Sequence, residues 1–218
     1  MLRWLTGAQI NPGWPATLGP LRTQAGAVGL RPVRLRDAKA WSELRIRNQN
    51  TLLPWEPSGV GTWAERHHPG AWPPLYSVLR AEAKRGAVLP FVIELDGEYI
   101  GQLTVGNIQR GAVRSAWIGY WVDARHFGQG IATAAVALGV DHCFGSVGLH
   151  RLDATVQPAN VASQAVLTKV GFRREGLLER YMDVNNRWRD HILFALTAEE
   201  IAGSAAEGLV RTGRASFH

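Results

Sequence analysis

The sequence predicts a mixed α/β (α+β) fold built around one sheet. Two observations support this: helical periodicity dominates the first part of the chain, and two turn-forming pairs, Asp96-Gly97 and Asn185-Asn186, each separate strand-like runs later in the chain. The 218 residues, 46% of them apolar and 19% charged, suffice for one packed domain.

Three helices are expected first. Asp37 can cap a helix that carries Trp41, and the capping box of residues 62–65 opens a short second helix. A third helix follows Pro73-Pro74 and ends near Gly86.

Strands follow. The run FVIEL, the pair Asp96-Gly97 and the run EYIGQLTV predict a hairpin, because a two-residue primed turn requires positive φ. Residues 113–123 are rich in aromatic and β-branched side chains and predict a third strand.

The remaining pattern alternates between helix and strand. A helix is expected after residue 130, a strand in HRLDATVQ, a helix over 161–170, two strands around Asn185-Asn186, and a last helix capped by Thr197 and Glu200. We expect a domain over residues 28–205, preceded by an extension (1–27) whose last part can pair as a first strand and followed by a tail (206–218).

Composition limits the classes of function. The single cysteine, Cys143, excludes an intramolecular disulfide and favours a cytoplasmic setting, and no run resembles a signal peptide or membrane span. The net charge of +6 comes from 21 Arg and 3 Lys against 18 acidic residues. It favours anionic partners, but no block of like charge marks a nucleic-acid arm. The histidines lack metal-ligand spacing, so no metal is expected.

The segment Arg125–Thr133 (RHFGQGIAT) joins a predicted strand to a predicted helix. Gly128 and Gly130 allow a tight turn whose amides, at the positive end of the helix dipole, can bind a diphosphate. An ordinary strand-to-helix turn also uses glycine, so this pattern alone leaves both readings open.

Four segments in order resemble one family. They are IGYWVDARHFGQGIAT, HRLDATVQPANVASQAVLTKVGF, REGLL and NNRWRDHILFAL, within residues 30–197. Together they resemble the Gcn5-related N-acetyltransferase (GNAT) superfamily, and within it the Rim-type (RimJ/RimL-like) ribosomal-protein N-terminal acetyltransferases. The resemblance implies a single mostly antiparallel twisted sheet, splayed at its centre and flanked by helices, and acetyl-CoA as co-substrate.

The resemblance also implies a set of site residues. The coenzyme A pyrophosphate would lie on the loop and helix start, and the pantetheine arm would pair with the backbone of the splayed strand. The residues concerned are Arg125, Gly128, Gln129, Gly130, Ile131, Ala132 and Thr133 for the pyrophosphate, Tyr120, Trp121 and Val122 for the pantetheine, and Asn160 and Ser163 near the thioester. Asn160 is equally suited to cap the following helix, and the strand aromatics to pack the core.

The implied chemistry is direct attack of an amine on the acetyl thioester, with backbone amides of the splayed strand holding the oxyanion. Ser163 would protonate the leaving thiolate. The resemblance does not identify the general base, because Trp117 stands where Rim-type members often carry Glu. Leu167 stands where some relatives carry a Tyr that acts as the general acid. Glu98, Asp123, Asp153 or a water chain are candidates for the base, and Asp153 could instead form a structural salt bridge.

A weak base favours an acceptor that is easily deprotonated. An α-amine has a pKa of about 8 and a lysine amine about 10.4, so far more of the former is neutral at pH 7. We therefore expect a protein N-terminus, such as that of a ribosomal protein beginning with Ala or Ser. The alternatives are a small-amine acetyltransferase, acting on an aminoglycoside, polyamine or amino acid, and a catalytically silent module that binds coenzyme A.

Overall fold

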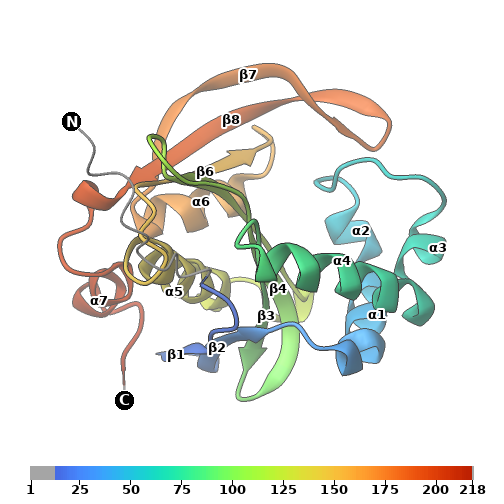
Figure 1. The fold of residues 1–218 in the computed structure, drawn as a ribbon, viewed down its shortest axis with the longest axis horizontal. Coiled ribbons are helices and arrows are strands. Elements are labelled where there is room, and N and C mark those ends of the chain that lie inside the picture. Colours follow the sequence, from blue (N-terminus) through green and yellow to red (C-terminus); the bar gives the residue numbers. More distant parts are fainter. Residues whose placement is uncertain (1–12, 218) are drawn as a thin grey trace.

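A computed structural model describes residues 13–217 of the chain (Figure 1). The strands are β1 (Leu18–Thr23), β2 (Gly26–Pro32), β3 (Leu89–Leu95), β4 (Glu98–Gln109), β5 (Ser115–Val122), β6 (Arg151–Val156), β7 (Arg173–Val184) and β8 (Arg187–Thr197). The α-helices are α1 (Ala38–Arg47), α2 (Gln49–Leu52), α3 (Trp63–His67), α4 (Trp72–Lys84), α5 (Ile131–Phe144), α6 (Val161–Val170) and α7 (Ala205–Arg211).

One sheet contains all these strands, in the order β1-β2-β3-β4-β5-β6-β8-β7. Every neighbouring pair is antiparallel except β5 and β6, which run parallel. This parallel pairing joins only residues 115–117 to residues 151–153. Beyond Trp117 and Asp153 the two strands separate, which confirms the central splay in a mostly antiparallel sheet.

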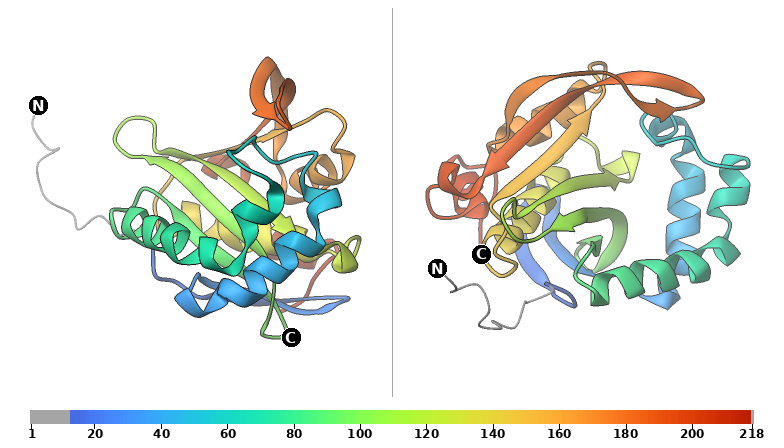
Figure 2. Two further views of the ribbon diagram at one scale, coloured as in Figure 1. Left: turned by 90° about the vertical axis from the view of Figure 1, so that its right-hand side faces the viewer. Right: turned by 45° about the horizontal axis from the view of Figure 1, so that its top comes forward.

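Helices cover both faces of the sheet (Figure 2). On one face, α5 is buried over most of its length and packs against β1, β2, β4, β5, α6 and α7. On the other, α1 and α4 hold a smaller apolar cluster that contains the buried indoles of Trp41 and Trp72. The almost uninterrupted apolar run of α5 therefore reflects a helix buried on nearly all sides.

Both predicted hairpin turns are confirmed. Asp96 and Gly97 have φ values of 49° and 86°, and Asn185 and Asn186 have 51° and 58°, as primed turns require. The capping box that opens α3 is also present, with the amide of Glu65 donating to the Thr62 hydroxyl at 3.2 Å.

Two predicted helix caps are wrong. The Asp37 carboxylate precedes α1 but does not cap it; it pairs with the Arg31 guanidinium and accepts a hydrogen bond from the amide of Arg34 at 2.7 Å. The capping box of Thr197 and Glu200 opens only a 3-10 turn over Ala198–Glu200.

The ends of the described chain join the sheet and the core. Strand β1 lies within the predicted extension and pairs with β2, and Arg22 also exchanges backbone hydrogen bonds with Ser216. The rest of that extension, residues 1–12, lies outside the described residues. Helix α7, at the border of the predicted tail, buries Leu209. Among residues 13–217 no helix is long and apolar enough to cross a bilayer.

Candidate functional site

The splay opens one edge of β5 inside the sheet. Residues 118–122 remain paired with β4 on their other side, while the side toward β6 has no strand partner among the described residues. Unpaired strand groups inside a sheet can accept an extended ligand. Because β5 runs directly into the glycine turn and α5, this edge is continuous with the candidate anion site.

The glycine turn has the backbone that the sequence predicts. Gly128 and Gly130 have φ values of 76° and 81°, in the left-handed region, and Gly130 is the N-cap of α5. Among the hydrogen bonds of the described residues, the amides of residues 128–133 have no protein acceptor. A Cβ built on Gly128 would meet no atom within 4 Å. Free amides, open space and the positive end of a long helix together suit a diphosphate.

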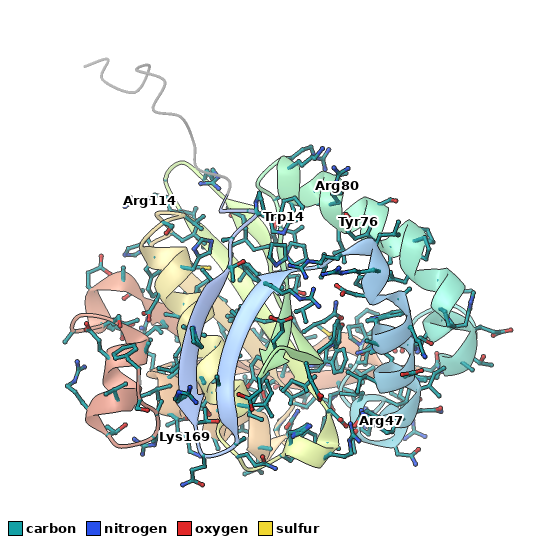
Figure 3. All side chains as sticks on the ribbon, turned by 90° about the horizontal axis from the view of Figure 1, so that it is seen from below. Trp14, Arg47, Tyr76, Arg80, Arg114 and Lys169 are labelled. Carbon is teal, nitrogen blue, oxygen red and sulfur yellow. The ribbon has the colours of Figure 1, made fainter. Side chains whose placement is uncertain are left out.

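A buried carboxylate fixes the start of this turn. Asp123 is fully buried and accepts hydrogen bonds from the Arg47 guanidinium at 2.6 Å and the Asn48 side-chain amide at 3.1 Å. Arg47, at the end of α1, is labelled in Figure 3. Burial alone would raise the pKa of Asp123, but the hydrogen bonds from Arg125, Asn48 and Arg47 outweigh it and lower that pKa. An anchored anion of lowered pKa is a poor proton acceptor, which argues against Asp123 as the general base.

No motif in the sequence indicates that Asn48 belongs to this site. Its side-chain oxygen accepts the Ala124 amide at 2.8 Å while its amide nitrogen donates to Asp123, so the C-cap residue of α1 holds two consecutive residues at the start of the turn. Such a contact depends on how α1 packs against the sheet.

Arg125 lies two residues after Asp123 and contacts its carboxylate. Its Nε donates to the Asp123 carboxylate at 2.8 Å, while its side chain is 63% exposed. The Gln129 side-chain amide reaches back to the Arg125 carbonyl at 3.4 Å. The predicted phosphate-binding arginine therefore lies at the mouth of the turn, oriented by an ion pair.

Tyr120 and Ser163 meet across the splay. The Tyr120 hydroxyl lies 3.0 Å from the Ser163 hydroxyl and 3.3 Å from the Ser163 carbonyl oxygen. Burial raises the pKa of Tyr120 to about 12 against the opposing hydrogen bond with Ser163. Asn160 caps α6, since its side-chain oxygen accepts the Ser163 amide at 3.1 Å.

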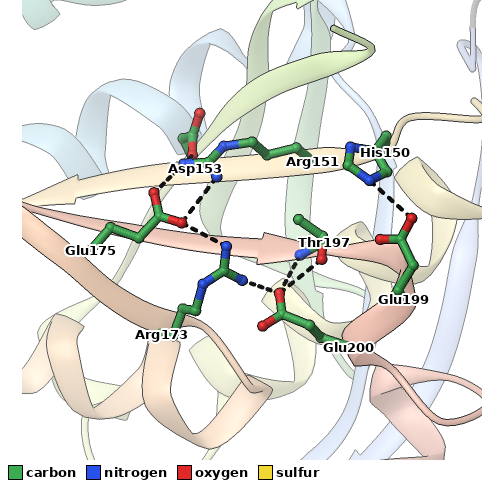
Figure 4. A network of polar contacts seen from close by, with 8 residues as sticks. All are labelled: His150, Arg151, Asp153, Arg173, Glu175, Thr197, Glu199 and Glu200. Carbon is green, nitrogen blue, oxygen red and sulfur yellow. Dashed lines mark hydrogen bonds and ion pairs between the residues drawn. The ribbon is translucent and has the colours of Figure 1, made fainter.

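Asp153 lies at the last residue pair before the strands separate, directly opposite Trp117. Its carboxylate pairs with the Arg151 guanidinium at 2.6 Å, and Arg151 also binds Glu175 at 2.5 Å. Figure 4 shows this chain of charges continuing through Arg173 to Glu200. The Asp153 side chain is still 31% exposed, so it combines the salt bridge with access to solvent.

The other positions discussed for proton transfer differ in exposure. Glu98 is an exposed residue at the start of β4, next to the hairpin turn. Trp117 is 45% exposed, whereas Leu167 is fully buried. The position where some relatives carry a tyrosine that acts as the general acid is thus part of the core in this chain.

The tip of the β7–β8 hairpin is fastened to the segment between α2 and α3. Pro57 bridges to Val184, and the Ser58 hydroxyl donates to the Asp183 carboxylate at 2.9 Å while accepting the Asn186 amide at 2.7 Å. We call these contacts the hairpin clasp. Figure 1 shows β7 and β8 extending across the molecule toward α2.

Two neighbouring cavities flank the clasp. The larger, of about 330 Å³, includes Trp55, Gln157 and Arg189 in its wall, and the smaller, of about 140 Å³, includes Glu56 and Arg66. Gln157 directly follows β6 and bonds to the Pro54 carbonyl at 2.9 Å, so the larger cavity adjoins the open end of the splay. Of the aromatic residues in the early loops, Trp63 and Trp72 are buried, and Trp55 is 37% exposed.

A buried polar cluster supports this wall. The Arg45 guanidinium pairs with Glu56, lies 2.9 Å from His67 Nε2, and stacks on the rings of Trp63 and Trp121 at 4.9 and 5.2 Å. Burial would raise the pKa of Glu56, but His67 and Arg45 together lower it. The cluster thereby joins β5 to the segment that carries the clasp.

Comparisons with known proteins agree with this arrangement. Residues 27–173 match the family described as Acetyltransferase (GNAT) domain. The structure of Mycobacterium smegmatis RimJ in complex with CoA-disulfide is similar, with 60% identity, a TM-score of 0.93 and coverage of 94% of this chain and 99% of that one.

Two curated proteins are also similar. The [ribosomal protein uS5]-alanine N-acetyltransferase of Escherichia coli (strain K12) is 27% identical over 191 residues, covering 86% of this chain and 96% of that protein. The probable N-acetyltransferase YjcK of Bacillus subtilis (strain 168) is 43% identical over 101 residues. That match spans 46% of this chain and only 56% of YjcK.

Proposed function

This chain belongs to the GNAT acetyltransferase family, and from that premise we propose that it moves the acetyl group of acetyl-CoA to the α-amine of a protein, a ribosomal protein being the proposed class of acceptor. The observation that carries the proposal is the glycine turn at the start of α5, directly beside the opened edge of β5. The 60% identity to a RimJ described in complex with a coenzyme A disulfide, and the likeness to the uS5-alanine enzyme, support the donor and the acceptor.

The donor-binding residues fit coenzyme A. The amides of residues 128–133 and the Arg125 guanidinium would bind the pyrophosphate, since both supply donors and positive charge. The open edge of β5 at Tyr120, Trp121 and Val122 would hold the pantetheine by backbone hydrogen bonds. Asn160 and Ser163, at the start of α6, would lie at the thioester.

The proposed reaction is direct attack of the neutral amine on the thioester carbonyl. Backbone amides of β5 would stabilise the negative charge that develops on the carbonyl oxygen, and Ser163 would protonate the leaving sulfur. Asp153 is the proposed base, because it lies where the strands part, is partly exposed and stands opposite Trp117. The ion pair with the Arg151 guanidinium, at 2.6 Å, holds the Asp153 carboxylate at this point.

The larger cavity is the proposed entry for the acceptor. An N-terminus needs little basic assistance, because about a tenth of α-amines but well under a thousandth of lysine amines are neutral at pH 7. The proposed setting is the cytoplasm, in keeping with a lone, buried cysteine that forms no disulfide.

A thiol-release assay with acetyl-CoA tests the function. Short peptides with a free N-terminus and varied first residues are compared with N-terminally blocked peptides that contain lysine, and with aminoglycosides, polyamines and amino acids. We expect turnover on free N-termini, with Ala or Ser first among them. Equal or faster turnover on blocked lysine peptides or small amines would contradict the acceptor, and binding of coenzyme A without thiol release would indicate a silent module.

A further inference from the structure

The hydroxyls of Tyr120 and Ser163 form a polar contact between the two elements that border the splay. Tyr120 comes from β5 and Ser163 from the first turn of α6, 43 residues later. The hydroxyls are 3.0 Å apart, and the Tyr120 oxygen is also 3.3 Å from the Ser163 carbonyl. The ring of Tyr120 packs against the apolar core, so its hydroxyl is held at this point.

Three features at this position suit the Ser163 hydroxyl to donate a proton. Ser163 lies in the first turn of the ten-residue helix α6, where the helix dipole stabilises anions. Its amide is bound by the Asn160 cap, which orients the residue. The tyrosine, whose pKa burial raises to about 12, is protonated in the resting enzyme at neutral pH and is therefore available as a hydrogen-bond donor to the serine oxygen.

We propose that Tyr120 is a positioning residue for Ser163, holding the serine hydroxyl toward the splay and donating a hydrogen bond to its oxygen as the proton leaves. The proposal rests on the function proposed above, which assigns Ser163 to the leaving sulfur. In this proposal the Tyr120 side chain positions Ser163, whereas the Tyr120 backbone pairs with the pantetheine arm.

The proton balance is closed. As the carbon–sulfur bond breaks, sulfur takes its electron pair and the Ser163 proton. The charge left on the serine oxygen is held by the Tyr120 hydroxyl and the start of α6. The proton that the amine nitrogen loses on acylation, passed through Asp153 or water, restores the serine hydroxyl. The net change moves one proton from nitrogen to sulfur and leaves the protein unchanged.

A double-mutant cycle tests the inference on the full chain. Tyr120→Phe, Ser163→Ala and the double variant are compared with wild type by thiol release, using acetyl-CoA and the peptide that wild type prefers. Tyr181→Phe is the matched control, because Tyr181 is 47% exposed on β7. Coenzyme A binding by calorimetry and thermal melting are measured for every variant.

We expect Tyr120→Phe to lower kcat by about tenfold to a hundredfold, the range for a hydrogen bond to a charged group. KM for acetyl-CoA should change less than about twofold, because the Tyr120 hydroxyl is not proposed to bind acetyl-CoA itself. In the Ser163→Ala background, removal of the Tyr120 hydroxyl should have little further effect, because the residue acts through the serine.

Three results would overturn the inference. They are an unchanged kcat in Tyr120→Phe, full multiplication of the two single effects in the double variant, and a loss of kcat matched by losses in melting temperature and coenzyme A affinity. If the wild type is active, any of these results contradicts only the role inferred for Tyr120 and leaves the proposed function intact. A wild type that binds coenzyme A but turns over no amine removes the proposed function, and this inference with it.

Discussion

Asn48 and Asp123 are 75 residues apart in the chain, and the Asn48 side-chain amide donates a 3.1 Å hydrogen bond to the buried Asp123 carboxylate. The same asparagine accepts the backbone amide of Ala124 at 2.8 Å. The C-cap residue of α1 thus contacts the two residues at the start of the glycine turn, beside the ion pair that Arg47 makes with Asp123. The geometry of the proposed donor site therefore depends on a helix that does not border it in sequence.

Asn48→Ala should destabilise the fold by about 2 kcal/mol, because it removes one hydrogen-bond donor from the buried Asp123 carboxylate and leaves the Ala124 amide without its partner. It should also weaken coenzyme A binding, since the turn loses a restraint. Urea unfolding and calorimetry measure the two effects. Asn50→Ala, at an exposed neighbouring position, is the control and should change stability by less than about 0.5 kcal/mol.

Asp123 should contribute to stability in a pH-dependent way. Its pKa in the folded protein is lowered, so its contribution is complete above its unfolded pKa of about 3.9 and is lost as the pH falls through the lower folded value. Melting temperatures between about pH 6 and pH 2.5 should therefore fall less steeply for Asp123→Asn than for wild type. Parallel curves for the two proteins would show that the carboxylate does not gain stability from its charge.

Gly128→Asp should reduce coenzyme A affinity by more than about a hundredfold, because it adds bulk and negative charge where the phosphates are proposed to bind. Gly111→Asp is a matched control: Gly111 also has positive φ, at 83°, and open space around its Cβ position. Isothermal calorimetry compares the two variants. Equal affinity in Gly128→Asp and wild type would exclude the turn as the phosphate site.

Asp153→Asn should lower kcat by about tenfold or more with little change in coenzyme A affinity, if this carboxylate accepts the amine proton. Glu175→Gln is the control, because Glu175 binds the same arginine from β7. A further variant combines Asp153→Asn with Trp117→Glu, which returns a carboxylate to the paired position on β5. Partial recovery of kcat is expected there, and equal losses in Asp153→Asn and Glu175→Gln would indicate a purely structural network.

Ser58→Ala should loosen the hairpin clasp by removing the hydroxyl that bonds both Asp183 and Asn186. Because the clasp borders both cavities, KM for a peptide acceptor should rise about threefold to tenfold, equivalent to about one hydrogen bond, while KM for acetyl-CoA stays constant. Steady-state kinetics with both substrates varied measures this. Ser77→Ala, on the exposed face of α4, should leave both constants unchanged.

Local chemistry allowed much of the fold to be predicted. Asp96-Gly97 and Asn185-Asn186 define their turns because few residues tolerate positive φ, and the glycine turn before α5 has the same basis. The capping pattern was less decisive. Thr197 and Glu200 open only a short turn, whereas Ser204 and Glu207, with the same spacing, begin α7, whose buried Leu209 supplies the packing that extends a helix.

The parts that could not be predicted rest on contacts between distant segments. No local pattern pairs Arg31 with Asp37, yet the Arg31 guanidinium binds that carboxylate in place of the amides at the start of α1. Likewise the hairpin clasp joins Ser58 to residues about 125 positions later, which no local pattern reveals. The contact of Tyr120 with Ser163 is likewise formed between distant segments. The local sequence indicates only a strand residue that packs in the core for Tyr120 and a helix residue for Ser163.

The short parallel pairing of β5 with β6 is the only place where strands β1 to β5 meet strands β6 to β8 in the sheet of the described residues. A bound substrate that pairs with the free edge of β5 would act as a missing strand and tie these two sets of strands together. Amide hydrogens of residues 118–122 should then exchange quickly in the free protein and slowly in the liganded one. The gap beside β5 would then be filled in each catalytic cycle, and the melting temperature of the protein would rise with the concentration of acetyl-CoA.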